Sequence, residues 1–113
     1  MYVTYYGRLG RIVGRGEIDR GSIEWVEVEK PLLRRGYGRA ILRDLVRRGA
    51  RRLTTVSVAM YHLVRSEPGW RYVGSVGPIS EGWGETDSVW EYIGASRDPQ
   101  RRRTLPRGFR ARS

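Results

Sequence analysis

The feature that most constrains the fold is a helical repeat placed between two strand-like segments. Apolar residues recur on one face of the helical segment, at Ile41, Leu42, Leu45 and Val46, and arginines occupy the opposite face. Residues 23–29 before it and 53–58 after it are rich in β-branched and aromatic side chains, which is typical of strands. This order predicts a βαβ unit, with two parallel strands joined by a right-handed crossover through the helix.

The flanking segments extend this unit into a larger sheet. Residues 2–7 and 11–14 are predicted strands, separated by turns at Leu9-Gly10 and at residues 19–21. A short helix is predicted over 59–65, followed by strands at 70–76 and 88–93 with a glycine-rich loop, 81–85, between them. The expected fold is therefore α/β (α+β), with a mixed, mostly antiparallel sheet, one parallel βαβ crossover and flanking helices.

Composition excludes several kinds of site. The chain has 113 residues, which suits a single domain. It has no cysteine, which excludes disulfides and thiolate ligands, and the single histidine, His62, argues against a multi-histidine metal site or a Ser-His-Asp triad. No apolar run approaches the roughly 20 residues that span a bilayer, and the N-terminus lacks signal-peptide features. We therefore expect no metal, no membrane partner and a cytoplasmic protein.

The charge is strongly positive and unevenly distributed. There are 22 basic and 12 acidic residues, for a formal net charge of +10, and residues 97–113 contain seven arginines and one acid. That segment also contains two prolines and few apolar residues, so it is predicted to be a disordered basic tail. The domain is accordingly expected over residues 1–96.

The loop that leads into the central helix has the composition of an anion site. Its sequence is Arg34-Arg35-Gly36-Tyr37-Gly38-Arg39-Ala40. Amides in the first turn of a helix have no intrahelical partner, glycines allow close approach to the backbone, and arginines add charge-assisted bonds. A Walker loop would end in Gly-Lys-Ser/Thr and a dinucleotide fingerprint would be G-x-G-x-x-G, and neither pattern is present. The alternative is that the two glycines only pack the helix against a strand.

This loop resembles the acetyl-CoA loop of the GNAT N-acetyltransferase family, whose pattern is Arg/Gln-x-x-Gly-x-Gly/Ala. The chain matches it over Arg35-Gly36-Tyr37-Gly38-Arg39-Ala40. Gly69-Trp70-Arg71-Tyr72-Val73-Gly74 is similar to the Gly-Phe-Arg-x-x-Gly stretch of that family, and Ile12-Val13-Gly14 resembles the end of its second strand. The likeness covers about residues 9–94.

The resemblance implies an acyl-CoA-dependent N-acyltransferase that moves an acetyl group from acetyl-CoA to a primary amine by direct attack in a ternary complex. The strand at 23–29 would splay from the strand at 53–58, and pantetheine would lie in the gap. Cofactor-binding positions would be the strand backbone at Val26 and Val28 and the loop residues Arg34, Arg35, Gly36, Tyr37, Gly38, Arg39 and Ala40.

The catalytic groups are harder to assign. Glu24 or Glu27 would be the general base, but strand alternation places them on opposite faces unless a bulge intervenes. The family's general-acid tyrosine falls at Arg65, which leaves Tyr61 as the nearest candidate. For any of these carboxylates the alternative is a solvated group or a partner of an arginine, and for Tyr61 it is a packing residue.

The family's first strand and first two helices have no counterpart in the chain. An open acceptor site would follow, which suits a large substrate such as a protein, or a site completed by a second copy in a homodimer. A non-catalytic CoA-binding relative is a further alternative.

The main alternative function is a basic nucleic-acid-binding module. The 97–113 tail would contact phosphates, and exposed aromatics would stack on bases. The aromatic residues expected to be exposed are Tyr2, Tyr5, Tyr6 and Trp83. A third reading is a scaffold that binds CoA or a partner without turnover.

Overall fold

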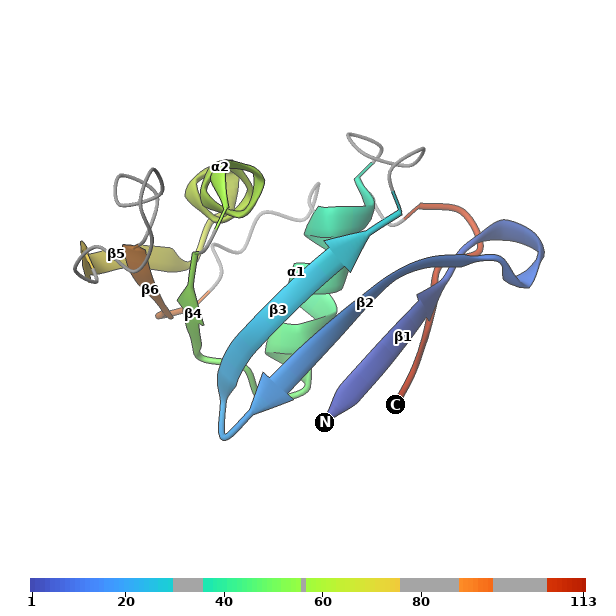
Figure 1. The fold of residues 1–113 in the computed structure, drawn as a ribbon, viewed down its shortest axis with the longest axis horizontal. Coiled ribbons are helices and arrows are strands. Elements are labelled where there is room, and N and C mark those ends of the chain that lie inside the picture. The colour runs from blue at the N-terminus through green and yellow to red at the C-terminus, as the bar shows by residue number, and fades with distance from the viewer. Residues whose placement is uncertain (30–35, 56, 76–87, 95–105) are drawn as a thin grey trace.

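The computed structural model describes residues 1–29, 36–55, 57–75, 88–94 and 106–113. Within these ranges the chain forms one seven-stranded sheet and two α-helices (Figure 1). The fold is a mixed α+β fold in which all but one of the described strand pairs are antiparallel.

The elements occur in the order expected from the sequence, with one strand added at the C-terminus. A short 3-10 turn, η1 (Arg8–Gly10), joins the first two strands. The remaining bounds are β1 (Tyr2–Tyr6), β2 (Ile12–Asp19), β3 (Ser22–Val28), α1 (Tyr37–Arg47), β4 (Arg52–Thr54), α2 (Val58–Ser66), β5 (Trp70–Ser75), β6 (Ser88–Tyr92) and β7 (Arg110–Arg112).

Two element boundaries differ from the expectation for local reasons. β2 continues past Gly14 to Asp19, because it pairs along its whole length with β3. β4 ends at Thr54, well before residue 58, because Ser57 already caps α2: its hydroxyl accepts a hydrogen bond from the Met60 amide at 3.2 Å. The predicted glycine-rich loop at 81–85 lies outside the described residues.

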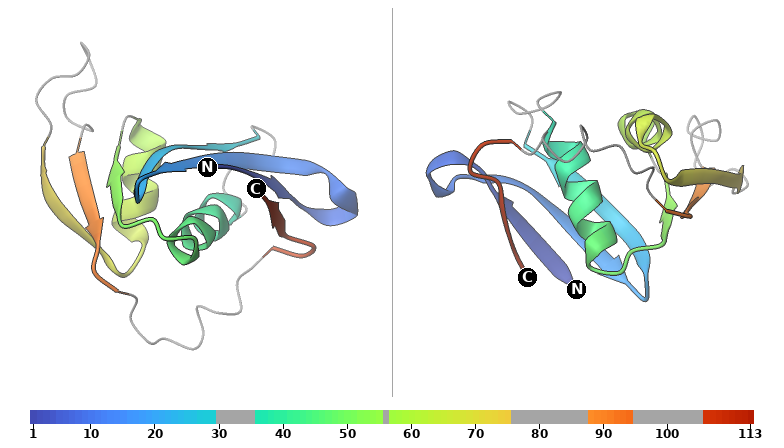
Figure 2. Two further views of the ribbon diagram at one scale, coloured as in Figure 1. Left: turned by 90° about the horizontal axis from the view of Figure 1, so that it is seen from below. Right: turned by 180° about the vertical axis from the view of Figure 1, so that it is seen from behind.

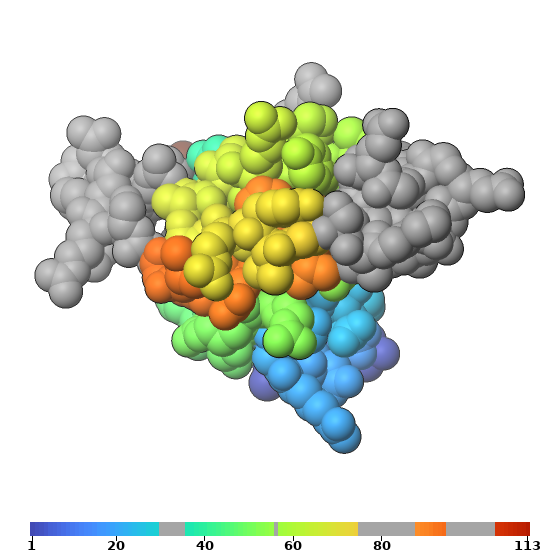
Figure 3. Space-filling model, turned by 90° about the vertical axis from the view of Figure 1, so that its left-hand side faces the viewer, coloured from blue at the N-terminus to red at the C-terminus, as the bar shows by residue number. Residues whose placement is uncertain are grey.

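The strands are arranged as β5-β6-β4-β3-β2-β1-β7. β3 and β4 run parallel and are connected through α1, which confirms the expected βαβ unit. α1 lies on one face of β1, β2 and β3 (Figure 2, left), while α2, β5 and β6 form the opposite end of the molecule (Figure 3).

Close packing of α1 depends on two glycines of β2. A Cβ at Gly14 would overlap the carbonyl oxygen of Glu27 and lie 2.7 Å from Ile41 Cδ1. A Cβ at Gly16 would lie 3.0 Å from Leu45 Cδ1. Ile41 and Leu45 are fully buried, so the missing side chains let the apolar face of α1 rest directly on the strand backbone.

A buried polar cluster also ties α1 to the sheet. Asp44 is 5% exposed and accepts hydrogen bonds from the Tyr5 hydroxyl, Arg47 and Arg48, at 2.8, 2.8 and 2.7 Å. Burial alone would raise the pKa of Asp44, but these three donors outweigh it and lower that pKa below its usual value. Burial and the adjacent Asp44 raise the pKa of Tyr5, which therefore stays protonated.

The end of the segment predicted as a largely disordered tail forms a short strand. β7 pairs antiparallel with β1 and forms an edge of the sheet, as Figure 2 shows on the left. Phe109 stacks on Tyr5 with ring centroids 5.4 Å apart, and its ring lies 6.4 Å from that of Tyr37. The prediction did not take into account that Phe109 and Ala111 pack against the core and that β7 pairs with β1. The remainder of the predicted tail, up to residue 105, lies outside the described residues.

The aromatic residues expected to be exposed do not share one environment. Tyr5 is fully buried, which overturns its prediction as a surface residue, because it points towards α1. Tyr2 is 66% exposed and Tyr6 is half-buried. Trp83 lies outside the described residues. Neither helix in the described part of the chain is long and apolar enough to cross a membrane.

Candidate functional site

A β-bulge in β3 determines which side chains share a face of the sheet. Glu17 pairs with Trp25 and Ile18 pairs with Ile23, so Glu24 is the additional residue on β3. Ile23 is buried in the core. The two residues that follow it face the other way, and alternation then returns Val26 to the core side.

Both candidate bases consequently lie on the same face. Glu24 and Glu27 are exposed on the face opposite α1. Strand alternation predicted that the two glutamates lie on opposite faces unless a bulge intervenes, and the bulge at Glu24 is present. Neither carboxylate has a hydrogen bond or ion pair with any described residue, so both are available to solvent or to a bound molecule.

β3 is paired with β4 only over its first two residues. Its pairing with β4 is limited to Ser22 with Arg52 and Ile23 with Leu53. From this end the two strands run apart, as Figure 1 shows. The second half of β3 therefore has no strand beside it on the β4 side within the described residues.

The backbone groups of Val26 and Val28 are directed to that unpaired side. The Glu29 amide donates to the Val13 carbonyl at 3.0 Å, which identifies this as a hydrogen-bonded pair of the β2–β3 ladder. Bonded and non-bonded pairs alternate in an antiparallel ladder, so the polar groups of every second β3 residue face β2. Those of Val26 and Val28 face the other way, where no described residue bonds to them.

The N-terminus of α1 has no capping side chain. Gly36 is the N-cap residue, with φ 86° and ψ 0°, a left-handed conformation that glycine adopts without strain. The first turn contains no acidic residue, and the Ala40 amide is the first to bond within the helix, to the Gly36 carbonyl at 3.1 Å. Amides of Tyr37, Gly38 and Arg39 have no partner among the described residues. Three donors and the positive end of the helix dipole are thus presented together.

Gly38 lies where α1, α2 and β3 meet. A Cβ there would be 3.4 Å from Leu63 Cδ2 and 3.8 Å from Val28 Cγ2, which are ordinary packing distances. Gly38 therefore does bring a helix close to a strand, as the packing alternative proposed. The same position also keeps side-chain atoms away from the unpaired amides of the first turn.

Other loop residues have structural contacts. Ala40 is buried in the core at 3% exposure, and Tyr37 is half-buried against Phe109 with its hydroxyl directed towards Gly7. Neither side chain points to the β3–β4 side. Only their backbone groups fit the expected cofactor role. Arg34 and Arg35 lie outside the described residues.

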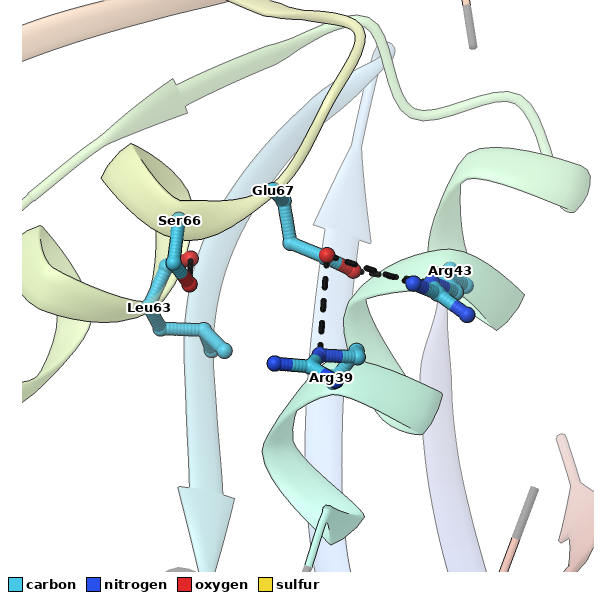
Figure 4. A network of polar contacts seen from close by, with 5 residues as sticks. All are labelled: Arg39, Arg43, Leu63, Ser66 and Glu67. Atoms are coloured by element: carbon cyan, nitrogen blue, oxygen red, sulfur yellow. Dashed lines mark hydrogen bonds and ion pairs between the residues drawn. The ribbon is translucent and has the colours of Figure 1, made fainter. Parts of the chain in front are cut away.

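Arg39 participates in an ion-pair network that joins the two helices. Glu67, which follows α2 and is 5% exposed, accepts from Arg43 Nε at 2.8 Å and lies 3.6 Å from Arg39 Nε (Figure 4). Sequence reasoning missed Glu67; the signal was a lone acid next to the Pro68-Gly69 helix stop. The network connects the end of α2 to the N-terminal half of α1 and directs the Arg39 side chain to Glu67.

Tyr61 is a packing residue in this structure. It lies on α2, where its ring contacts Trp90 of β6 edge-on at 6.2 Å. The guanidinium of Arg65 lies over the same ring at 5.9 Å, and His62 flanks it. Tyr61 thus contacts β6 through its ring.

No family model matches this chain, and neither a curated protein nor a solved structure matches it. The described residues contain no group of three or more histidine, cysteine or acidic side chains placed to hold a metal ion.

Proposed function

We propose that this chain is an acyl-CoA-dependent N-acyltransferase similar to the GNAT family, which moves an acetyl group from acetyl-CoA to a primary amine. The proposal rests on one observation. The part of β3 that is not paired with β4 precedes the arginine-bearing loop in sequence, and the helix α1 after this loop has no capping side chain at its N-terminus. Strand order and the parallel β3-α1-β4 crossover are consistent with it.

The unpaired groups match the chemistry of coenzyme A. Pantetheine contains two amides that can extend a strand, and the outward-facing backbone groups of Val26 and Val28 would be their partners. The diphosphate would accept from the amides of Tyr37, Gly38 and Arg39, because a helix N-terminus favours anions. Arg34 and Arg35 precede these amides in sequence and would add charge-assisted bonds.

Transfer would proceed without a covalent enzyme intermediate. The acceptor nitrogen attacks the thioester carbonyl, the C–N bond forms, the C–S bond breaks and the thiolate of CoA leaves. Before this attack, Glu24 or Glu27 would accept one proton from the ammonium form of the acceptor, directly or through water, which leaves a neutral amine. The nitrogen would lose its second proton to solvent as the C–S bond breaks. Since both glutamates lie on the face opposite α1, the acceptor would approach over that face. The thiolate would take its proton from solvent, because Tyr61 lies on the β6 side of α2.

Calorimetry with acetyl-CoA tests the cofactor site. We expect binding by the wild-type chain and loss of binding in the Arg34→Ala/Arg35→Ala variant. The matched control is Arg20→Ala, which removes a positive charge from the β2–β3 turn at the opposite end of β3 (Figure 1). Equal affinity in all three proteins would overturn the proposal.

Substitutions of Gly38 separate packing from binding. Gly38→Ala introduces only ordinary contacts and should preserve both the fold and acetyl-CoA affinity. Gly38→Glu adds a carboxylate beside the expected diphosphate and should abolish binding through charge repulsion. Retained affinity in Gly38→Glu, with an unchanged circular-dichroism spectrum, would contradict the site.

A turnover assay separates an enzyme from a CoA-binding scaffold. Release of free CoA thiol is followed with acetyl-CoA and a panel of primary amines, including lysine-containing peptides. We expect Glu24→Gln or Glu27→Gln to lower kcat while leaving acetyl-CoA affinity unchanged. Acetyl-CoA binding without thiol release for any amine would identify a non-catalytic relative.

A further inference from the structure

Among the described residues, no helix or strand covers the face of the sheet opposite α1, over β7, β1, β2 and β3. Figure 1 looks onto this face, and α1 lies behind it. Side chains there are those that alternate with the core residues Val3 and Tyr5 on β1, together with their cross-strand neighbours. No described helix covers them.

Aromatic rings lie on this face at both ends of β1 and on β3. Tyr2 is 66% exposed, and its ring centroid lies 6.5 Å from that of Trp25 at a tilt of 56°. Trp25 is held by a hydrogen bond of 3.0 Å from its Nε1 to Glu17. A hydrogen bond with Glu17 and the charge of Glu17 raise the pKa of the Tyr2 hydroxyl, so this ring stays neutral. Tyr6 lies on the same face at the other end of β1.

β7 contributes positive charges beside β1, the strand that carries Tyr2 and Tyr6. In its pairing with β1, Arg110 lies opposite Tyr6 and Arg112 lies opposite Thr4, while Ala111 packs against the core. Both arginines are exposed and, by strand alternation, lie on the aromatic face. Arg15 of β2 lies opposite Thr4 on the other side.

The acidic residues of this face lie on β2 and β3, and Glu17 is directly opposite Tyr2 of β1. Glu17, Glu24 and Glu27 are on β2 and β3, away from the β7 edge. A polyanion crossing the face would therefore place its charges along β7. This polarity fits a ligand that has an anionic backbone on one side and flat rings on the other.

We propose that this uncovered face binds single-stranded nucleic acid, with phosphates along Arg110 and Arg112 and bases stacked on Tyr2 and Tyr6. Stacking on aromatic side chains beside a basic groove is how single strands are held without sequence readout. The net charge of +10 adds long-range attraction to a polyanion. Among the described residues, Arg110 and Arg112 of β7 and Arg15 of β2 lie beside β1.

This inference stands apart from the proposed acyltransferase. The CoA contacts are expected at the α1 N-terminus and the loop before it, and the acceptor would approach the β3 part of this face, whereas the nucleic acid would lie along β7 and β1. Acetyl-CoA is absent from the binding experiment, so failure of either proposal leaves the other intact.

Fluorescence anisotropy with labelled oligo(U) and oligo(dT) tests the proposal over a range of salt concentrations. Tyr2→Ala and Tyr6→Ala should each weaken binding about fivefold to a hundredfold, without changing the slope of log affinity against log salt. Arg110→Gln/Arg112→Gln should reduce that slope by about 1.4, or about 0.7 for each lost phosphate contact.

Control variants separate this site from general charge attraction. Tyr2→Phe and Tyr6→Phe keep the rings and should bind within about twofold of wild type, which guards against loss of folding in the alanine variants. Arg20→Gln/Arg71→Gln removes two charges, one at the β2–β3 turn and one on β5, neither of which lies on β7 or on its neighbour β1, and should leave the slope closer to wild type than the β7 variant.

Three results would overturn the proposal. The first is wild-type affinity in both tyrosine-to-alanine variants, and the second is equally tight binding of a duplex, whose paired bases cannot stack on the rings. The third is a dimer in sedimentation velocity, without nucleic acid, that Tyr2→Ala dissociates, since a second copy would then cover the face.

Discussion

The hydroxyl of Tyr5 donates a 2.8 Å hydrogen bond to the buried carboxylate of Asp44, joining the N-terminal strand to the middle of α1. Arg47 and Arg48 complete the set of donors to Asp44. The charged carboxylate of Asp44 is thus buried together with its three hydrogen-bond donors. Removing one donor from a buried charge costs more folding stability than removing one from a charge at the surface.

Tyr5→Phe should therefore destabilise the protein. The change removes one hydrogen bond to a buried charge and leaves the ring packed, so we expect a loss of about 1–3 kcal/mol in the free energy of unfolding. Urea denaturation measures it. Tyr92→Phe is the control, because the Tyr92 hydroxyl has no hydrogen-bond partner among the described residues, and should change the stability by much less.

The hydrogen bonds of Asp44 also make the stability of the protein depend on pH. The pKa of Asp44 is lower in the folded protein than in the unfolded chain, so its contribution is present above the unfolded value of about 3.9 and is lost as pH falls below it. We expect the melting temperature of wild type to drop between about pH 5 and pH 2. Asp44→Asn should be less stable at pH 7 and show a shallower fall over that range. An equally steep fall in the variant would assign the acid sensitivity to other carboxylates.

Gly14→Ala tests the close contact between β2 and its neighbours. The new Cβ would overlap the Glu27 carbonyl oxygen, which is backbone and cannot rotate away, and would crowd Ile41. We expect a loss of about 1–3 kcal/mol in unfolding free energy. Gly74→Ala is the matched control in β5, where the added Cβ meets nothing within 4 Å, and should be neutral or slightly stabilising. Similar losses in both variants would show that the β2 contact is not responsible.

Removal of the C-terminal segment tests whether β7 belongs to the fold. Truncation after Gly94 takes away β7 and the Phe109 ring that stacks on Tyr5. We expect a clearly lower melting temperature, and Phe109→Ala alone should cost about 1–3 kcal/mol, because the side chain is partly buried. An unchanged melting temperature for the truncated chain would support the tail boundary expected from the sequence at residue 97.

Much of the fold was accessible from local patterns. The apolar face of α1, the β-branched strands and the glycine and proline turns predicted eight of the described helices and strands in the right order. These features depend on contacts within a few residues, which periodicity records directly. For the candidate site, the loop composition indicated an anion site, and the structure adds that the first amides of α1 have no partner among the described residues.

The rest needed the tertiary structure, because it depends on pairing between distant segments. The bulge at Glu24 arises from the register of β2 against β3, and no local pattern specifies that register. Glu67 gains its role only when α2 lies beside α1.

By itself, then, the sequence determined the order of strands and helices, the basic charge and the glycine-bearing entry to α1. Tertiary structure decided that Arg110–Arg112 joins the edge of β1, that Tyr5 turns inward to Asp44, and that both β3 glutamates share one face. Local patterns follow from the intrinsic geometry of helix and strand, whereas the partner of an edge strand depends on which distant segment buries an apolar ring against it.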